Sequence, residues 1–304
     1  MFKHLIPLKW FLLSMLGLIW GMAFMGVEMA LKGFNPLTIA AFRIVIAGLT
    51  LNCLAFFMGY KLPSIKQKHG KKILLHCLGM GILSNLIPFS LLSWSQIHVS
   101  SGYAGIAMAV VPLIILPLSH YFIPNMKMTF TKIVGFIIGF LGVIILIGPS
   151  TIFSSENDSM ILAKFTCILA SCSYALGSIV TRLTPQINLI SFSACSLLIA
   201  SVLIIPLALF FEGIPKFSNW ISVFGILYLG FFPTALATIL LVFLIREAGP
   251  PFLGLVNYQV PVWAVLIGYF LLNENLPSSF VLALFVILFG LFISEFLNKK
   301  TAKD

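Results

Sequence analysis

The sequence predicts an all-α integral membrane protein with ten transmembrane helices, arranged as two inverted repeats of five helices. Three observations carry this prediction: the composition, ten apolar runs of span length, and a weak internal repeat. Of the 304 residues, 60% are hydrophobic and only 9% are charged, and the mean hydropathy is +1.12. Because a soluble domain carries about 25% charged residues, most of this surface is expected to face lipid.

Ten apolar runs are long enough to span, since crossing a hydrocarbon core of about 30 Å takes about 20 apolar residues. Helices are expected because a helix satisfies its own backbone hydrogen bonds in lipid. The runs are residues 10–30, 36–58, 73–96, 101–122, 130–148, 161–182, 188–210, 219–245, 252–272 and 278–297. The first run follows a basic start, but its full length and the lack of a clean cleavage site favour a retained helix over a signal peptide.

The distribution of positive charge predicts the orientation. Ten spans place both termini on one side, which would hold fourteen of the 18 Lys and Arg residues, against three on the other side. Because cytoplasmic loops carry an excess of Lys and Arg, we expect an inner membrane protein with both termini in the cytoplasm. The net charge of +10, concentrated in SIKQKHGKK (64–72), is therefore a topology signal, and no nucleic-acid partner is expected.

The chain repeats itself weakly, which divides it into one unit at 1–150 and a second at 151–304. GILSNLIP (81–88) resembles GILYLGFFP (225–233), and VSSGYAGIAMAVVPLIILP (99–117) resembles AGPPFLGLVNYQVPVWAVL (248–266). The prolines at matching positions, which are expected to kink helices, are Pro88, Pro112, Pro233 and Pro261. Because five spans is an odd number, the second unit enters the membrane from the opposite side, an arrangement typical of alternating-access transporters.

A family resemblance follows from these motifs. LIWGMAFMGVEMALKGFNPLTIAAFRIVIAG (18–48) resembles the opening of an EamA-type member of the drug/metabolite transporter superfamily, through Trp20-Gly21, Asn35-Pro36 and Ala41-Phe42-Arg43. The resemblance covers nearly the whole chain as two tandem EamA units. It implies ten helices, cytoplasmic termini, a central cavity built from both halves, and export or exchange of small metabolites, often amino acids or their relatives.

Two departures leave the substrate class more open. Glu28 stands where the family often carries a basic residue late in the first helix. The second half has LLNENLP (271–277), which resembles the family's acidic turn, whereas the first half has IPNMKM (123–128) in the matching place.

Arg43 lies in the second predicted span, where inserting an arginine costs roughly 2.5–3.5 kcal/mol. Three roles remain open: it contacts an anionic group of the substrate, it pairs with Glu28 on the adjacent helix, or its side chain snorkels to the interface. Glu28 is the only carboxylate predicted within the bundle, so it is the candidate for proton coupling or gating, with a structural charge as the alternative.

The other candidates for the cavity wall are amides, hydroxyls and aromatic side chains within the spans. Each could instead form an interhelical hydrogen bond that only stabilises packing. With Arg43, the candidates are Trp20, Asn85, Trp94, Tyr103, Tyr174, Ser178, Asn257, Tyr258, Gln259 and Trp263. They predict an amphipathic cavity of modest polarity, which suits amino acids or amphiphilic metabolites better than multiply phosphorylated substrates.

No cofactor and no metal site are expected. The five cysteines lie inside predicted spans without a CxxC pair, and no HExxH or GxSxG motif suggests an enzyme. A channel, a non-transporting membrane protein or a membrane-embedded enzyme remains the alternative. GFIIGFLG (135–142) places Gly135, Gly139 and Gly142 on one helical face, which serves either helix packing or a homodimer. Transport direction, coupling and oligomeric state are not fixed by the sequence.

Overall fold

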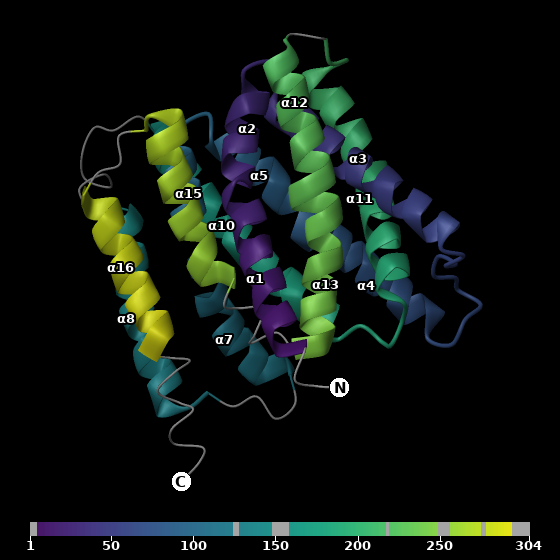
Figure 1. Ribbon diagram of the computed structural model, residues 1–304, viewed down its shortest axis with the longest axis horizontal. Helices are drawn as coiled ribbons and strands as arrows, with labels where there is room; N and C mark the ends of the chain where they lie inside the picture. Colours follow the sequence, from purple (N-terminus) through teal and green to yellow (C-terminus); the bar gives the residue numbers. More distant parts are fainter. Residues whose placement is uncertain are drawn as a thin grey trace.

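The regular structure in the described part of the chain is helical throughout (Figure 1). The computed structural model describes residues 5–123, 128–147, 158–216, 219–248, 256–274 and 278–293. The helices up to residue 147 are α1 (Leu5–Gly21), α2 (Ala23–Leu31), α3 (Pro36–Phe57), α4 (Gly70–Gly81), η2 (Ile82–Leu86), α5 (Ile87–Ser95), α6 (Ser101–Ala107), α7 (Val110–Phe122) and α8 (Phe130–Ile147). Those from residue 158 on are α10 (Asp158–Arg182), α11 (Leu189–Glu212), α12 (Trp220–Leu229), η3 (Gly230–Leu236), α13 (Ala237–Ala248), α15 (Val256–Leu272) and α16 (Ser278–Phe292).

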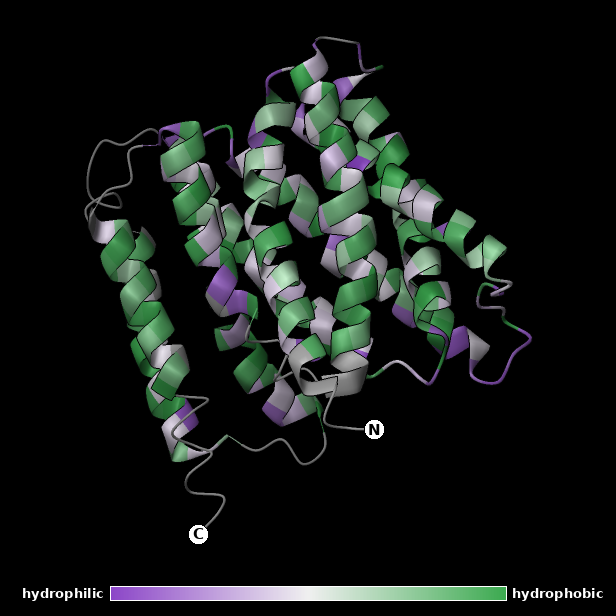
Figure 2. Ribbon diagram, viewed as in Figure 1, coloured by the Kyte–Doolittle hydropathy of each residue, from purple (hydrophilic) through white to green (hydrophobic). Residues whose placement is uncertain are grey.

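Seven helical segments of the described chain are long and apolar enough to cross a membrane. They are Leu8–Leu31, Pro36–Phe57, Gly70–Ser95, Ser101–Phe122, Asp158–Arg182, Leu189–Glu212 and Trp220–Leu244, and shorter apolar helices cover Phe130–Leu146, Gln259–Leu272 and Ser279–Gly290. Apolar residues cover the helix shafts, whereas polar residues gather at helix ends and in the loop after α3 (Figure 2). The chain is therefore a multi-pass membrane protein, and the count of ten spans in an inverted repeat stays a prediction.

Two of the long segments contain a π-helical turn, and both turns fall in the pair of repeated motifs that end in proline. In the first, η2 joins α4 to α5, and Pro88 follows it directly in the first turn of α5. In the second, η3 joins α12 to α13 and contains Pro233. A proline has no N–H to donate, so a carbonyl of the preceding turn loses its partner.

A polar side chain bonds to a backbone carbonyl in each π-helical segment. Asn85 Nδ2 donates to the Met80 carbonyl at 3.3 Å, and Thr234 Oγ1 donates to the Leu229 carbonyl at 2.7 Å, each reaching five residues back. Since π-turns often mark functional sites, these two segments are the first place to look for one.

The other two matched prolines lie in different settings. Pro112 lies in the first turn of α7, just after the chain breaks helical continuity between α6 and α7. Pro261 lies inside α15, whose described residues form one helix.

Helices from the two halves of the chain interleave. The most extensive packing joins α3 to α11, α8 to α16, α5 to α10, α6 to α15 and α2 to α12, and each of these pairs has one member from each half. Small residues permit the close approach: a Cβ on Gly81 would lie 2.6 Å from the Ser196 carbonyl oxygen of α11. The core is thus shared between the halves, so neither half forms a separate domain.

The bundle has two distinct ends. We call the end where α1 begins and α16 ends the terminal end, and the opposite one the distal end (Figure 1). At the distal end, Glu212 of α11 accepts hydrogen bonds from the backbone N–H groups of Leu37 (2.8 Å) and Thr38 (2.7 Å) at the start of α3. The Thr38 hydroxyl donates to the same carboxylate at 2.8 Å.

A second carboxylate repeats this arrangement. Glu274, just after α15, accepts hydrogen bonds from the N–H groups of Ser101 (2.8 Å) and Gly102 (3.0 Å) at the start of α6. The first N–H groups of a helix have no partner within the helix, and an anion there is also favoured by the helix dipole. Two carboxylates from the second half thus cap two helices of the first half and hold the distal end together.

The glycines of α8 are used for packing within the chain. A Cβ on Gly142 would lie 2.7 Å from Ile287 Cγ1 of α16, and one on Gly290 would collide with the Gly139 backbone. A Cβ on Gly139 would also meet Leu113 of α7 at 2.6 Å. This glycine face is therefore covered by α16 and α7 of the same chain.

Candidate functional site

A cavity lies between the two halves of the bundle. The empty space between its lining atoms is about 1370 Å³, including the open mouth. Its wall is made by Trp20, Ala23, Phe24, Val27, Arg43, Met80, Ser84, Asn85, Phe89, Leu92, Gln96, Met108, Val111, Ile115, Ser119, Ile123, Tyr174, Ser178, Ile179, Thr181, Arg182, Pro233, Thr238, Leu241, Asn257 and Val260. Both π-helical segments contribute to this wall.

The cavity reaches the surface at the terminal end. Thr181 and Arg182 of its wall lie in the last turn of α10, and Arg182 is exposed. Toward the distal end the wall is formed by Val27 and Gln96, which are 3% and 5% exposed. Gln96 Nε2 donates to the Phe24 carbonyl at 2.9 Å and so joins α5 to α2 below the distal surface. The cavity is thus accessible from one end and covered at the other.

Arg43 is buried on the cavity wall, with only 6% of its surface exposed. It lies seven residues after the start of α3, about 10 Å along the helix at 1.5 Å per residue. Its Nε donates to Thr234 Oγ1 of η3 at 2.7 Å, and its Cζ lies 3.6 Å from the ring centroid of Phe89. A cation over an aromatic face is a favourable contact that partly replaces water.

Arg43 does not pair with Glu28. Its partners among the described residues are Thr234 and Phe89, while Tyr174 and Tyr228 lie within electrostatic range. Glu28 lies in α2 toward the distal end, where it interacts electrostatically with Glu274 and Lys32. The burial of Arg43 also rules out a side chain that snorkels to the interface, so the charge faces the interior of the protein.

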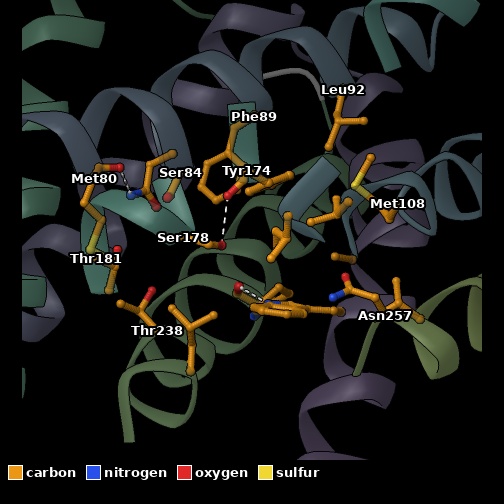
Figure 3. Close-up of a pocket in the computed structure, with 18 of the residues that line it drawn as sticks. Met80, Ser84, Phe89, Leu92, Met108, Tyr174, Ser178, Thr181, Thr238 and Asn257 are labelled. Atoms are coloured by element: carbon orange, nitrogen blue, oxygen red, sulfur yellow. Dashed lines mark hydrogen bonds between the residues drawn. The ribbon is translucent and has the colours of Figure 1, made fainter. Parts of the chain in front are cut away.

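Aromatic and hydroxyl groups surround this cation. The Phe89 and Tyr174 rings meet edge to face with centroids 6.4 Å apart, and Ser178 Oγ donates to the Tyr174 carbonyl at 2.9 Å. Figure 3 shows these three side chains together on one side of the cavity, with Asn257 and Met108 on another. The wall combines one buried cation, hydrogen-bonding groups and large apolar surfaces, as an amphiphilic ligand requires.

The structure brings together six of the side chains that the sequence indicates for the cavity wall. They are Trp20, Arg43, Asn85, Tyr174, Ser178 and Asn257. Trp20 also donates its indole N–H to the Pro233 carbonyl at 3.3 Å, which joins α1 to η3. The side chain of Tyr258 lies outside the described residues, so its place stays a prediction.

Four other candidates do not line this cavity. Trp263 is 37% exposed and lies against Gly21 of α1, and Trp94 lies against His98 with ring centroids 5.1 Å apart. Tyr103 is fully buried and packs edge to face on Phe280.

Gln259 lies against Gly17 of α1: a Cβ added to Gly17 would lie 2.9 Å from the Gln259 side chain. The period of a helix is visible in the sequence, but which of its faces turns inward depends on the neighbouring helix, which the sequence does not show.

Several wall residues could not be identified from the sequence, because they resemble many other residues of the predicted spans. Phe89, Phe24 and Met108 read as ordinary span residues, although Phe89 directly follows the matched Pro88. The hydroxyls Ser84, Thr181 and Thr238 are equally inconspicuous among many span hydroxyls.

The fold and the site together define a class of protein: a multi-pass helical membrane protein with a partly polar cavity between two interleaved halves of the chain. The chain belongs to the EamA-like transporter family, whose model matches residues 8–148 and again residues 161–296. The family relation explains why the two π-helical segments recur in matching parts of the chain.

Named relatives agree with this family. The chain is 28% identical over 295 residues to the uncharacterized inner membrane transporter YedA of Escherichia coli, which covers 95% of this chain and 90% of the relative. It is 22% identical to the uncharacterized transporter YoaV of Bacillus subtilis (92% and 94% covered) and 23% identical to protein PecM of Dickeya dadantii (91% and 89% covered). A solved crystal structure superposes with a TM-score of 0.71 over 97% of this chain and 99% of that chain, at 15% identity, and shows the same fold.

Proposed function

We propose that this protein is a secondary transporter of small amphiphilic metabolites, such as amino acids and their relatives, in the inner membrane. It exports or exchanges them by alternating access, with ten spans and both termini in the cytoplasm. The observation that carries the proposal is a cavity deep in the bundle that reaches the surface at one end and is covered at the other.

The pairing of helices supports an inverted repeat. Counting spans from the N-terminus, α3 with α11 is the second with the seventh, α6 with α15 the fourth with the ninth, and α8 with α16 the fifth with the tenth. A two-fold axis in the membrane plane relates each span to the one five places on, so such pairs are expected to meet across it. Inverted repeats of this kind rock around a central site.

The contacts at the distal end support a conformational cycle. Glu212 and Glu274 join the two halves through capping hydrogen bonds, next to the apolar packing of α3 on α11. These hydrogen bonds can be exchanged for hydrogen bonds to water when the distal end opens. The positive-charge count supports a cytoplasmic terminal end, and with that orientation we propose that this conformation is the inward-facing one.

Saturable flux tests the proposal. Purified protein in proteoliposomes would be assayed with radiolabelled amino acids and related organic acids, with and without an imposed pH gradient. We expect saturable uptake of at least one compound, and uptake that rises with the gradient would support proton coupling, for which Glu28 is the acidic candidate. Flux that rises linearly with concentration would favour a channel, and no flux across the panel would contradict the proposal.

A further inference from the structure

The guanidinium of Arg43 has donors without a protein acceptor. An arginine carries five N–H donors in a planar fork, and here Nε alone is used, by Thr234 Oγ1. Among the described residues no acceptor meets the two terminal nitrogens. Leaving a buried charge without a counter-ion is costly, and the residue lies on the wall of the cavity.

The hydroxyl of Tyr174 is a second free group at the same place. Tyr174 lines the cavity within electrostatic range of Arg43, and its ring is fixed against Phe89. Its hydroxyl has no hydrogen-bond partner among the described residues and is not sealed from the cavity. Two sets of hydrogen-bond donors are therefore available to one ligand group.

The charge of the wall is unbalanced. No Asp or Glu side chain belongs to the described wall, whose cations are the buried Arg43 and the exposed Arg182 at the mouth. Field strength is high in a low-dielectric site, so the cavity favours an anion and disfavours a cation. A single guanidinium fork matches one carboxylate with two parallel hydrogen bonds.

We propose that Arg43 and Tyr174 form a subsite for one carboxylate, so that the transported compounds are organic monocarboxylates whose apolar body packs on Phe89, Trp20 and Met108. This inference rests on the proposed transport function and adds the charge of the transported compounds. Monoanions are preferred over neutral compounds of the same shape, and organic cations are rejected. The ammonium group of a zwitterion meets only neutral acceptors in the described wall, so the carboxylate provides its main charged contact.

A ligand series of constant shape tests the subsite. Binding of 3-phenylpropionate, 3-phenylpropionamide and 3-phenylpropylamine to the purified protein would be measured by calorimetry at neutral pH. We expect the carboxylate to bind at least tenfold more tightly than the amide, and the amine most weakly. Equal affinities, a preference for the amine, or no binding by any of the three would overturn the proposal.

Substitutions test whether the preference for the carboxylate comes from Arg43 and Tyr174. Arg43→Gln is expected to weaken carboxylate binding at least tenfold and amide binding less than twofold. Arg43→Lys keeps the charge but loses the fork and is expected to be intermediate. Lys61→Gln, which removes an exposed cation from the loop after α3, is the matched control and is expected to leave the whole series unchanged.

Tyr174→Phe keeps the test valid should Arg43→Gln fail to fold. It retains the ring on Phe89 and removes one donor, so we expect a loss of about threefold in carboxylate binding alone. An unchanged carboxylate preference in both Arg43→Lys and Tyr174→Phe would assign Arg43 a structural role and overturn the subsite. Saturable flux of the amide without carboxylate preference would overturn the subsite and leave transport standing, whereas carboxylate binding without any flux would do the reverse.

Discussion

Replacing Glu212 with Gln should loosen the distal end of the bundle. The Glu212 carboxylate uses both oxygens to accept three hydrogen bonds, at 2.8, 2.7 and 2.8 Å, from the start of α3. The N-cap residue Asn35 makes no side-chain capping bond of its own. Glu212 therefore supplies, from the other half of the chain, the cap that α3 lacks.

The size of the effect follows from these bonds. Hydrogen bonds to a charged group contribute about 1.5–3 kcal/mol, and neutral ones about 0.5–1.5 kcal/mol. A glutamine keeps one acceptor oxygen and turns an N–H donor toward another N–H, so we expect a loss of about 2 kcal/mol. Because each 1.4 kcal/mol is a factor of ten, the ratio of distal-open to distal-closed molecules should rise about 30-fold.

Thiol labelling measures this shift. Val27 lies at the distal limit of the cavity and is 3% exposed. In a variant without native cysteines, Val27→Cys would be labelled from the distal side with a membrane-impermeant maleimide. We expect Glu212→Gln to accelerate labelling strongly. Lys216→Gln, which changes an exposed charge at the same end, serves as the control.

An unchanged labelling rate would contradict this prediction. If Glu212→Gln and Lys216→Gln label at the same slow rate as the parent while the protein stays folded, the carboxylate cap does not hold the distal end closed. The distal contacts would then be ordinary helix caps without a part in the conformational cycle.

Two further predictions concern packing and the cavity wall. Gly290→Val forces α16 away from the backbone of Gly139, so the thermal unfolding midpoint in detergent should fall clearly. Phe289→Leu, at an exposed position, is the control and should leave the midpoint nearly unchanged. Equal midpoints for the two variants would contradict the close packing of α16 on α8. Trp20→Phe keeps the aromatic wall but leaves the Pro233 carbonyl without its donor, a loss of about 1 kcal/mol, so KM for a transported compound should rise severalfold with little change in maximal rate. An unaltered KM in both Trp20→Phe and Trp20→Ala would remove this side chain from the substrate path.

Composition and local motifs are sufficient to predict the class of protein and part of the candidate site. The helical membrane fold follows from the apolar runs, and the two proline motifs mark segments that the structure shows as π-helical. Arg43 was identifiable because a charge in a span is expensive unless it serves the interior. These signals are local in the chain, so a single sequence carries them.

Contacts between distant residues were beyond the sequence. The acceptor for Arg43 is Thr234, 191 residues away, and nothing in either segment indicates the pair. Pairing with Glu28 on the adjacent helix was one of the three roles considered for Arg43, but Glu28 lies toward Glu274 instead. Helix faces such as those of Trp263 and Tyr103 depend in the same way on which neighbour covers them.

Counterflow in proteoliposomes distinguishes alternating access from a channel, because a carrier with alternating access exchanges solute faster than it returns empty. Vesicles preloaded with an unlabelled transported compound would be diluted into the same compound in labelled form at low concentration. We expect a transient accumulation of label above equilibrium, absent from vesicles without protein. A protein that carries saturable flux but gives no overshoot at any preload would contradict alternating access through this cavity.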